Sequence, residues 1–238
     1  MTALTLDGVN TFYGRSHILF DLSLEARHGA VTCLLGRNGS GKTTTIRTIM
    51  GLTPPASGTI AWEGRRISGL RPWQIFRLGI KLVPQGRGIF PRLSVEENLR
   101  LAMVRAEIGD AGVELGKVWA LFPILEERRR QPGATLSGGQ LQMLAIARAL
   151  LGRTRLILMD EPTEGLAPLV VQSIREALGQ IRASGVTVLL AEQNVRLALE
   201  IGDQHHIIDN GRIRFSGPSE AIRSNEDVKT SYLGVSRR

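Results

Sequence analysis

The sequence predicts an α/β fold in which parallel strands and helices form a core that is interrupted by a helical segment. Short apolar runs, typical of strands buried in a parallel sheet, occur at Val31–Leu35, Leu156–Met159 and Val186–Ala191. A glycine-rich turn and then a helical stretch follow the first run, which is the order of a strand–turn–helix unit. Between the first run and the other two, from Ser94 to Leu151, the pattern is helical.

This order predicts one domain of 238 residues with two parts. We expect residues 1–87 and 154–238 to form the α/β core, and residues 88–153 to form a helical subdomain inserted into it. A chain of this length can bury a sizeable hydrophobic core.

Local signals predict where several helices begin and end. A helix is expected from Thr43 to Met50, because Gly51 follows as a stop signal. The segments Ser94–Glu97 and Ser137–Gln140 have the spacing of capping boxes, so each predicts a helix start. A further helix is expected over Lys117–Arg130.

Two expectations concern the end of the chain. Asn210-Gly211 stands between the apolar stretches Ile207-Ile208 and Ile213–Phe215 and predicts a type I′ hairpin, because both of its residues tolerate positive φ. We expect Ser231–Arg238 to be a mobile tail.

The composition excludes several classes of protein. With 42% hydrophobic and 22% charged residues, 27 Gly and 10 Pro, the chain is near the globular average, which excludes collagen-like, disordered and disulfide-scaffold proteins. No eighteen consecutive residues are apolar, so no membrane span is expected. The N-terminus lacks the pattern of a secretory signal, and the single Cys33 suits a reducing compartment. We therefore expect a cytoplasmic protein.

The net charge of +8 has two explanations. A basic surface favours nucleic acids, anionic membrane surfaces or anionic nucleotides. An ordinary solvated surface rich in arginine accounts for the charge equally well, since only four of the 30 basic residues are lysines and the arginines are spread along the chain.

A phosphate-binding loop follows the first buried strand. Its glycines allow backbone N–H groups to point at phosphate oxygens, and the start of the next helix adds a positive dipole end. Lys42 would contact the β- and γ-phosphates, and the Thr43 hydroxyl would bind Mg²⁺. We assign nucleotide binding to this loop and the residue after it, namely Gly36, Arg37, Asn38, Gly39, Ser40, Gly41, Lys42, Thr43 and Thr44.

Two adjacent carboxylates end the buried strand Leu156–Met159. Ligands bind at the carboxyl ends of strands in α/β sheets, so Asp160 is placed to hold Mg²⁺. Glu161 would polarise the attacking water as general base. An apolar strand that ends in two acids is by itself usually only a strand end, but the phosphate loop upstream favours the catalytic interpretation.

A second anion-binding turn is predicted at Leu136–Gln140. A serine with a glutamine three residues later does no more than start a helix, but the two glycines between them are not needed for capping. They expose backbone N–H groups at a positive helix end. A second anion-binding turn implies a second nucleotide, most simply one bound to another subunit.

In this order and spacing, the phosphate loop, Leu136–Gln140 and Asp160-Glu161 resemble the ATP-binding subunits of ABC transporters. The resemblance covers essentially the whole chain. It implies a P-loop NTPase core of the RecA-like type with an N-terminal antiparallel β portion and an inserted helical subdomain. It also implies head-to-tail dimers in which the signature residues face ATP held by the partner's phosphate loop; these are Ser137, Gly138, Gly139 and Gln140.

The resemblance also implies further site residues. Tyr13 would stack on adenine, and Gln85 would join the Mg²⁺ site and sense a permease. ATP and Mg²⁺ are the implied cofactors.

The implied partners are two transmembrane permease subunits and, indirectly, a periplasmic or extracellular solute-binding protein. The chain would lie peripherally on the cytoplasmic face of the inner (plasma) membrane. No nucleic acid is expected as a partner.

Finer motifs resemble one branch of this family, the LivF-type subunits of branched-chain amino acid uptake. The ATPases of urea and short-amide uptake share much of the pattern, so they stay an alternative. The segments that carry this resemblance are Val83–Arg87, Ile89–Pro91, Val95–Leu99, Asp160–Glu164 and Gly165–Val171.

The chain departs from the wider family at Gln193, where most members have a histidine that contacts the γ-phosphate. Glutamine still donates and accepts hydrogen bonds but carries no imidazolium charge. We expect Gln193 to act in catalysis with Lys42 and Glu161. We also expect a second, non-identical ATPase subunit that carries the histidine, giving a heterodimer. Most members also have an aspartate at the end of the loop that follows Asp160-Glu161; here that loop reads Glu164–Ala167 and ends in alanine, so the carboxylate is missing.

Two other functions are considered. An ABC-type ATPase acting on nucleic acid or ribosomes would use the positive charge, but the chain has neither a sustained heptad array nor a second phosphate loop. A regulatory subunit without hydrolysis would explain Gln193 and Ala167. The presence of Lys42, Asp160 and Glu161 argues against it.

Overall fold

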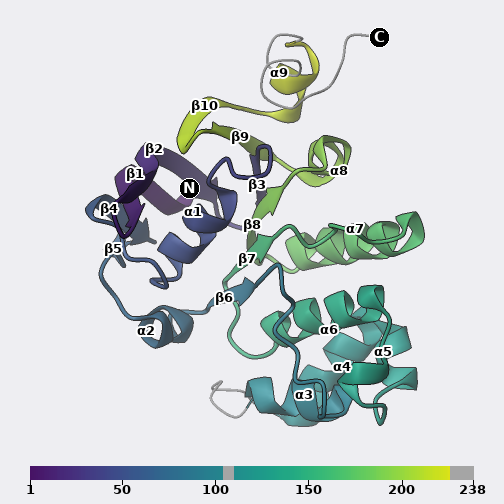
Figure 1. The fold of residues 1–238 in the computed structure, drawn as a ribbon. Coiled ribbons are helices and arrows are strands. Elements are labelled where there is room, and N and C mark those ends of the chain that lie inside the picture. Colours follow the sequence, from purple (N-terminus) through teal and green to yellow (C-terminus); the bar gives the residue numbers. More distant parts are fainter. Residues whose placement is uncertain (104–109, 226–238) are drawn as a thin grey trace.

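Two sheets and a group of helices make up the chain (Figure 1). The structure, a computed structural model, describes residues 1–103 and 110–225. The expected tail over Ser231–Arg238 lies outside these residues. The strands are β1 Thr2–Tyr13, β2 Ser16–Arg27, β3 Val31–Leu35, β4 Ser57–Trp62, β5 Arg65–Arg66, β6 Ile80–Val83, β7 Leu156–Asp160, β8 Thr187–Glu192, β9 Gln204–Asp209 and β10 Arg212–Gly217. The helices are α1 Lys42–Ile49, α2 Pro72–Arg77, α3 Val95–Met103, α4 Ala111–Leu121, α5 Pro123–Glu127, α6 Gly138–Leu150, α7 Pro168–Ala183, α8 Val195–Ile201 and α9 Ser219–Arg223, with a 3₁₀ turn at Gly133–Thr135.

The larger sheet has the strand order β10-β9-β3-β8-β7-β6, and only β10 runs antiparallel to its neighbour. The smaller sheet is antiparallel, in the order β2-β1-β4-β5. The α/β fold class is therefore confirmed, including an N-terminal antiparallel portion.

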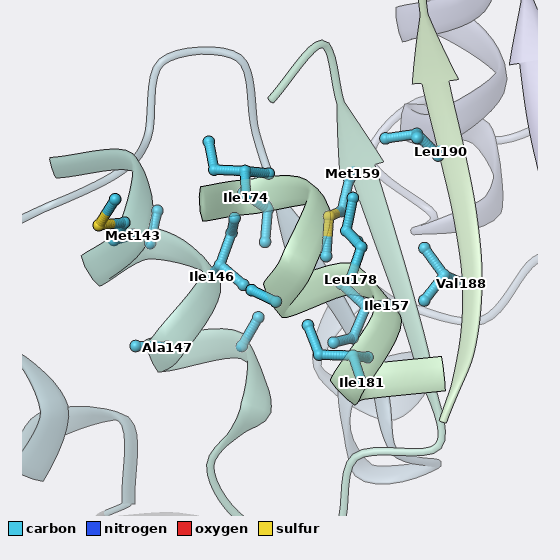
Figure 2. Packing of buried hydrophobic residues seen from close by; sticks show 14 of the residues in the cluster. Met143, Ile146, Ala147, Ile157, Met159, Ile174, Leu178, Ile181, Val188 and Leu190 are labelled. Carbon is cyan, nitrogen blue, oxygen red and sulfur yellow. The ribbon is translucent and has the colours of Figure 1, made fainter. Parts of the chain in front are cut away.

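Both faces of the larger sheet are covered, which explains its continuous apolar strands. On β7, Leu158 faces the core shared with α1 and the smaller sheet, whereas Met159 faces the helices of the other side. Figure 2 shows that second core: Ile174, Leu178 and Ile181 of α7 lie between β7 and β8 on one side and α6 on the other. Each such fully buried aliphatic side chain contributes roughly 1.5–3 kcal/mol to folding.

The described helices between β6 and β7 run from α3 to α6 and group to one side of the larger sheet (Figure 1). The division of the chain at residues 88–153 stays a proposal. Both predicted capping boxes are present: the Glu97 amide donates to Ser94 Oγ at 3.2 Å, and the Gln140 amide donates to Ser137 Oγ at 3.3 Å.

One predicted helix was wrong. Instead of a single helix over Lys117–Arg130, α4 starts at Ala111 and a separate α5 ends at Glu127. The Asp110 carboxylate caps α4 by accepting from the amides of its first turn. Pro123 has no N–H to continue α4, so it opens α5 instead.

The predicted hairpin is confirmed. Asn210 and Gly211 have φ of 47° and 71°, as a type I′ turn requires, and they join β9 to β10. Within the two described ranges, no helix is both long and apolar enough to cross a bilayer.

Two buried histidines of β9 predict that the fold weakens in mild acid. Burial lowers the pKa of both His205 and His206. As the pH falls through about 6.5, the unfolded chain therefore takes up protons that the folded chain does not. We expect the free energy of unfolding to fall between pH 7 and pH 5.5, by up to about 1.4 kcal/mol per pH unit for each histidine.

Urea unfolding at several pH values measures this slope. His206→Gln should flatten it, because His206 then no longer titrates, while His28→Gln at a half-exposed histidine serves as control. An unchanged slope in His206→Gln would contradict the assignment.

Candidate nucleotide site

The predicted site residues meet at the carboxyl edge of the larger sheet. β3 runs directly into the phosphate loop, β7 ends at Asp160, and β8, which lies between these two strands, ends at Glu192. Gln85 comes two residues after β6, at the same edge. Residues that are far apart in the sequence are thereby brought to one place, as expected for ligand sites of α/β sheets.

The phosphate loop turns tightly over the end of β9. Gly41 has a φ of 114°, which only glycine adopts without strain. At Gly36, a Cβ would lie 2.4 Å from the Ile208 carbonyl oxygen, so a side chain there would displace the loop. Ser40 Oγ is buried in the loop without a hydrogen-bond partner. Glycine at positions 36 and 41 therefore keeps side chains away from the backbone there, as in loops that bind phosphates.

A buried ion pair lies inside this loop. Lys42 Nζ is 2.9 Å from Glu161 Oε1, and both side chains are almost completely buried. Lys42 Nζ also donates to the carbonyl oxygens of Gly36 and Arg37 at 2.8 and 2.9 Å. The cation is thus held where phosphate groups on the loop would meet it, and the carboxylate next to it is placed to take a proton.

Glu161 has an unusual backbone conformation. Its φ is 48°, in the left-handed region that costs a residue other than glycine roughly 1–3 kcal/mol. The Glu161 amide donates to the Ala191 carbonyl oxygen at 2.9 Å, which ties the loop after β7 to β8. Strain of this kind persists only where the surrounding structure enforces it, and it gathers at functional sites.

Thr43 and Asp160, which the sequence predicts to bind a cation, lie next to each other. Thr43 Oγ1 donates to Asp160 Oδ1 at 3.1 Å. Burial raises the pKa of Asp160 and the neighbouring Glu161 adds to this, while the hydrogen bond from Thr43 acts in the opposite direction. A bound divalent cation would remove that burial penalty, so the donor set of one hydroxyl and one carboxylate fits Mg²⁺ held jointly with phosphates.

Gln85 lies in the cleft but is engaged by two carboxylates. Its amide donates to Glu164 Oε2 at 2.7 Å and to Glu161 Oε2 at 3.3 Å. The contact with Glu164 was not predicted. The only hint of it in the sequence is an acid three residues after the proposed base.

The phosphate loop, the start of α1, Gln85 and Glu161 contribute to a cleft of about 420 Å³. Tyr13, at the end of β1, lines it with its side chain partly exposed, in keeping with a ring that stacks on a planar ligand. The other lining residues are Ile18, Asn38, Gly39, Gly41, Lys42, Thr43, Thr44, Gln85 and Glu161.

Gln193 is not among the residues that line this cleft. It follows β8 and is exposed, and its backbone N–H donates to Glu192 Oε2 at 3.1 Å. Glu192, which the sequence analysis did not single out, is almost completely buried and also accepts from Thr163. Its only signal in the sequence is an acid directly after the apolar residues Val188–Ala191.

The signature turn lies apart from the cleft of its own chain. Ser137 and Gln140 cap α6 reciprocally, and neither lines the cleft. Gly139 has a second reason to be glycine, because a Cβ there would lie 2.6 Å from Val170 Cγ1 of α7. Close packing therefore accounts for one of the two glycines that capping left unexplained.

Comparison with known proteins identifies the family to which the chain belongs. A family model described as ABC transporter matches residues 19–164. The chain is 44% identical over 231 residues to the high-affinity branched-chain amino acid transport ATP-binding protein BraG of Pseudomonas aeruginosa, covering 97% of this chain and 99% of that protein. It is 34% identical over 228 residues to the probable branched-chain amino acid transport ATP-binding protein LivF of Archaeoglobus fulgidus, covering 95% and 97% of the two chains.

Solved structures agree with this. A nucleotide-free ATP-binding cassette from an ABC transporter superimposes with a TM-score of 0.84 at 25% identity, over 100% of both chains. The ADP conformation of another such cassette gives a TM-score of 0.84 at 26% identity, over 99% of this chain and 100% of the other. The chain therefore belongs to the ABC transporter family, as one of its ATP-binding proteins.

Proposed function

We propose that this chain hydrolyses Mg·ATP to power a membrane importer for branched-chain amino acids. The observation that carries the proposal is the convergence of Lys42, Glu161 and Thr43 in one cleft, with Asp160 hydrogen-bonded to Thr43. The solute follows from the names of the relatives BraG and LivF, which match nearly the whole chain.

The residues divide the work as follows. The phosphate loop binds the phosphates through its amides, and Lys42 binds the β- and γ-phosphates. Thr43 and Asp160 would hold Mg²⁺, which neutralises charge on the phosphate oxygens, with Gln85 as a further oxygen donor. Glu161 accepts the proton of the attacking water. For both charged side chains to act, the ion pair between Lys42 and Glu161 has to loosen when nucleotide binds.

The signature turn serves a second nucleotide in this proposal. Ser137, Gly138, Gly139 and Gln140 start α6 and do not line the cleft of their own chain. Ser137 is exposed and Gly138 and Gln140 are partly exposed, so this helix start can face ATP on another subunit. The exposed Gln193 favours a non-identical partner ATPase that supplies a histidine. Such a heterodimer would have two unequal sites.

A groove between the core and the helices α3 and α6 is suited to a permease. Its volume is about 650 Å³, and the half-exposed Trp73, Phe90 and Leu101 lie along it. Lys81, Arg87 and Arg148 also line it, and its described lining contains neither Asp nor Glu. We assign it to an apolar helix of a permease loop that carries a carboxylate, since such a helix matches both the apolar walls and the charge. We therefore propose that the chain lies peripherally on the cytoplasmic face of the inner (plasma) membrane.

Replacing the proposed base tests hydrolysis. Glu161→Gln should lower ATP turnover by at least about 10²-fold, because a general base typically contributes about 10²–10⁴-fold, while binding of ATP is retained. The readouts are phosphate release and the Kd of a fluorescent ATP analogue. Glu126→Gln, at an exposed carboxylate of α5, is the matched control. Full turnover in Glu161→Gln would contradict the assignment.

The same variant tests the partner. In Mg·ATP the isolated Glu161→Gln chain should stay monomeric by light scattering, because the proposed dimer needs an unlike subunit. A stable homodimer would overturn the heterodimer but not the hydrolysis.

The groove predicts where the permease docks. The double substitution Trp73→Ser and Leu101→Ser should abolish copurification with permease subunits while nucleotide binding by the isolated chain stays intact, since both side chains are half-exposed and outside the cleft. Val113→Ser, on an exposed apolar residue of α4, is the control. Undiminished copurification of the double variant would contradict the assignment of the groove.

A further inference from the structure

Glu192 is a buried carboxylate to which the proposed mechanism gives no part. It is the last residue of β8 and pairs with Leu35 of β3, directly below the phosphate loop. Only 2% of it is exposed, and it does not line the nucleotide cleft. A carboxylate is costly to bury unless it is well hydrogen-bonded, so its partners indicate its purpose.

Both oxygens of Glu192 are used. Oε1 accepts from Thr163 Oγ1 at 2.7 Å, and Oε2 accepts from the backbone N–H groups of Gln193 and Asn194 at 3.1 and 3.2 Å. Burial raises the pKa of Glu192, and these hydrogen bonds act in the opposite direction. One side chain thus joins the loop after β7 to the segment after β8.

The joined loop is the one that holds Glu161. Thr163 follows it by two residues, and Glu161 itself has the strained φ of 48°. Two hydrogen bonds fix the loop on either side of Thr163. The Glu161 backbone N–H donates to the Ala191 carbonyl oxygen, and the Gln85 side-chain amide donates to the Glu164 carboxylate. The bond from Thr163 to Glu192 lies between them and is shielded from water, since Thr163 is only 6% exposed. Water therefore cannot replace it if one partner is removed.

We propose that Glu192 and Thr163 are positioning residues, whose mutual hydrogen bond fixes the loop that carries Glu161 and links that loop to the backbone at Gln193, so that the Glu161 carboxylate reaches the attacking water once nucleotide has bound. This inference rests on the proposed role of Glu161. If the bond between Thr163 and Glu192 is broken, we expect the rate of the chemical step to fall and nucleotide binding to be retained, because misplacing a reacting group by about 1 Å can cost 10²-fold in rate.

A pair of substitutions at Thr163 tests the proposal on the full chain, purified with the subunits that accompany it. Thr163→Val keeps the shape but removes the hydroxyl, and should lower kcat at least about 10-fold while the KM for ATP and the Kd of a non-hydrolysable ATP analogue change less than about 3-fold. Thr163→Ser retains the hydroxyl and should restore kcat. In Glu192→Gln the side-chain oxygen can still accept from the two backbone N–H groups and the side-chain NH₂ can donate to Thr163 Oγ1, so this variant should keep kcat within about 3-fold of the unaltered chain.

The matched control is Thr187→Val at the other end of β8. That threonine is equally buried, and its hydroxyl accepts from the Gly29 amide at 3.1 Å, far from the loop. Its kcat should stay within about 2-fold of the unaltered chain.

Three results would overturn the proposal: unchanged kcat in Thr163→Val, a rise in KM that accounts for the loss, or failure of Thr163→Ser to restore kcat. Rates are expressed per bound nucleotide, so a variant that is only partly folded is still scored. If Glu161→Gln also kept full turnover, the proposed function would fail with it; if only Thr163→Val did, the positioning role alone would fail.

Discussion

The site depends on the parallel register of three neighbouring strands. β8 lies between β3 and β7, and Asp160 pairs with Ala191 while Leu35 pairs with Glu192. Because side chains alternate between the two faces of a strand, a slip of one residue would turn the buried set outward. Both faces are packed, so the apolar cores fix this register, and the register in turn places the phosphate loop beside the carboxylates.

The second constraint is charge that is kept out of water. Lys42 and Glu161 neutralise each other at 2.9 Å, whereas Asp160 and Glu192 rely on hydroxyl and amide donors. Breaking a buried pair by removing one partner typically costs about 3–5 kcal/mol, so such groups are retained only where their surroundings are complete. Incoming phosphates offer Lys42 an alternative partner, which would free Glu161 for a proton.

Features coded by adjacent residues were predictable. The phosphate loop, both capping boxes and the Asn210-Gly211 hairpin depend on local backbone chemistry and are present. Contacts between residues that are far apart in the sequence were not predictable, because no local pattern indicates that Glu192 bonds to Thr163 or that Glu164 bonds to Gln85. The predicted helix Lys117–Arg130 failed because its apolar periodicity continues through Pro123, where the missing N–H ends one helix and starts another.

The most direct test of this account is a crystal structure of the chain with Mg²⁺ and a non-hydrolysable ATP analogue. We predict that Lys42 Nζ leaves Glu161 for the phosphate oxygens, that Thr43 and Asp160 lie at the cation, and that Glu192 keeps its hydrogen bond to Thr163. An analogue bound outside the Lys42 cleft, or an intact pair between Lys42 and Glu161 beside bound phosphates, would contradict it.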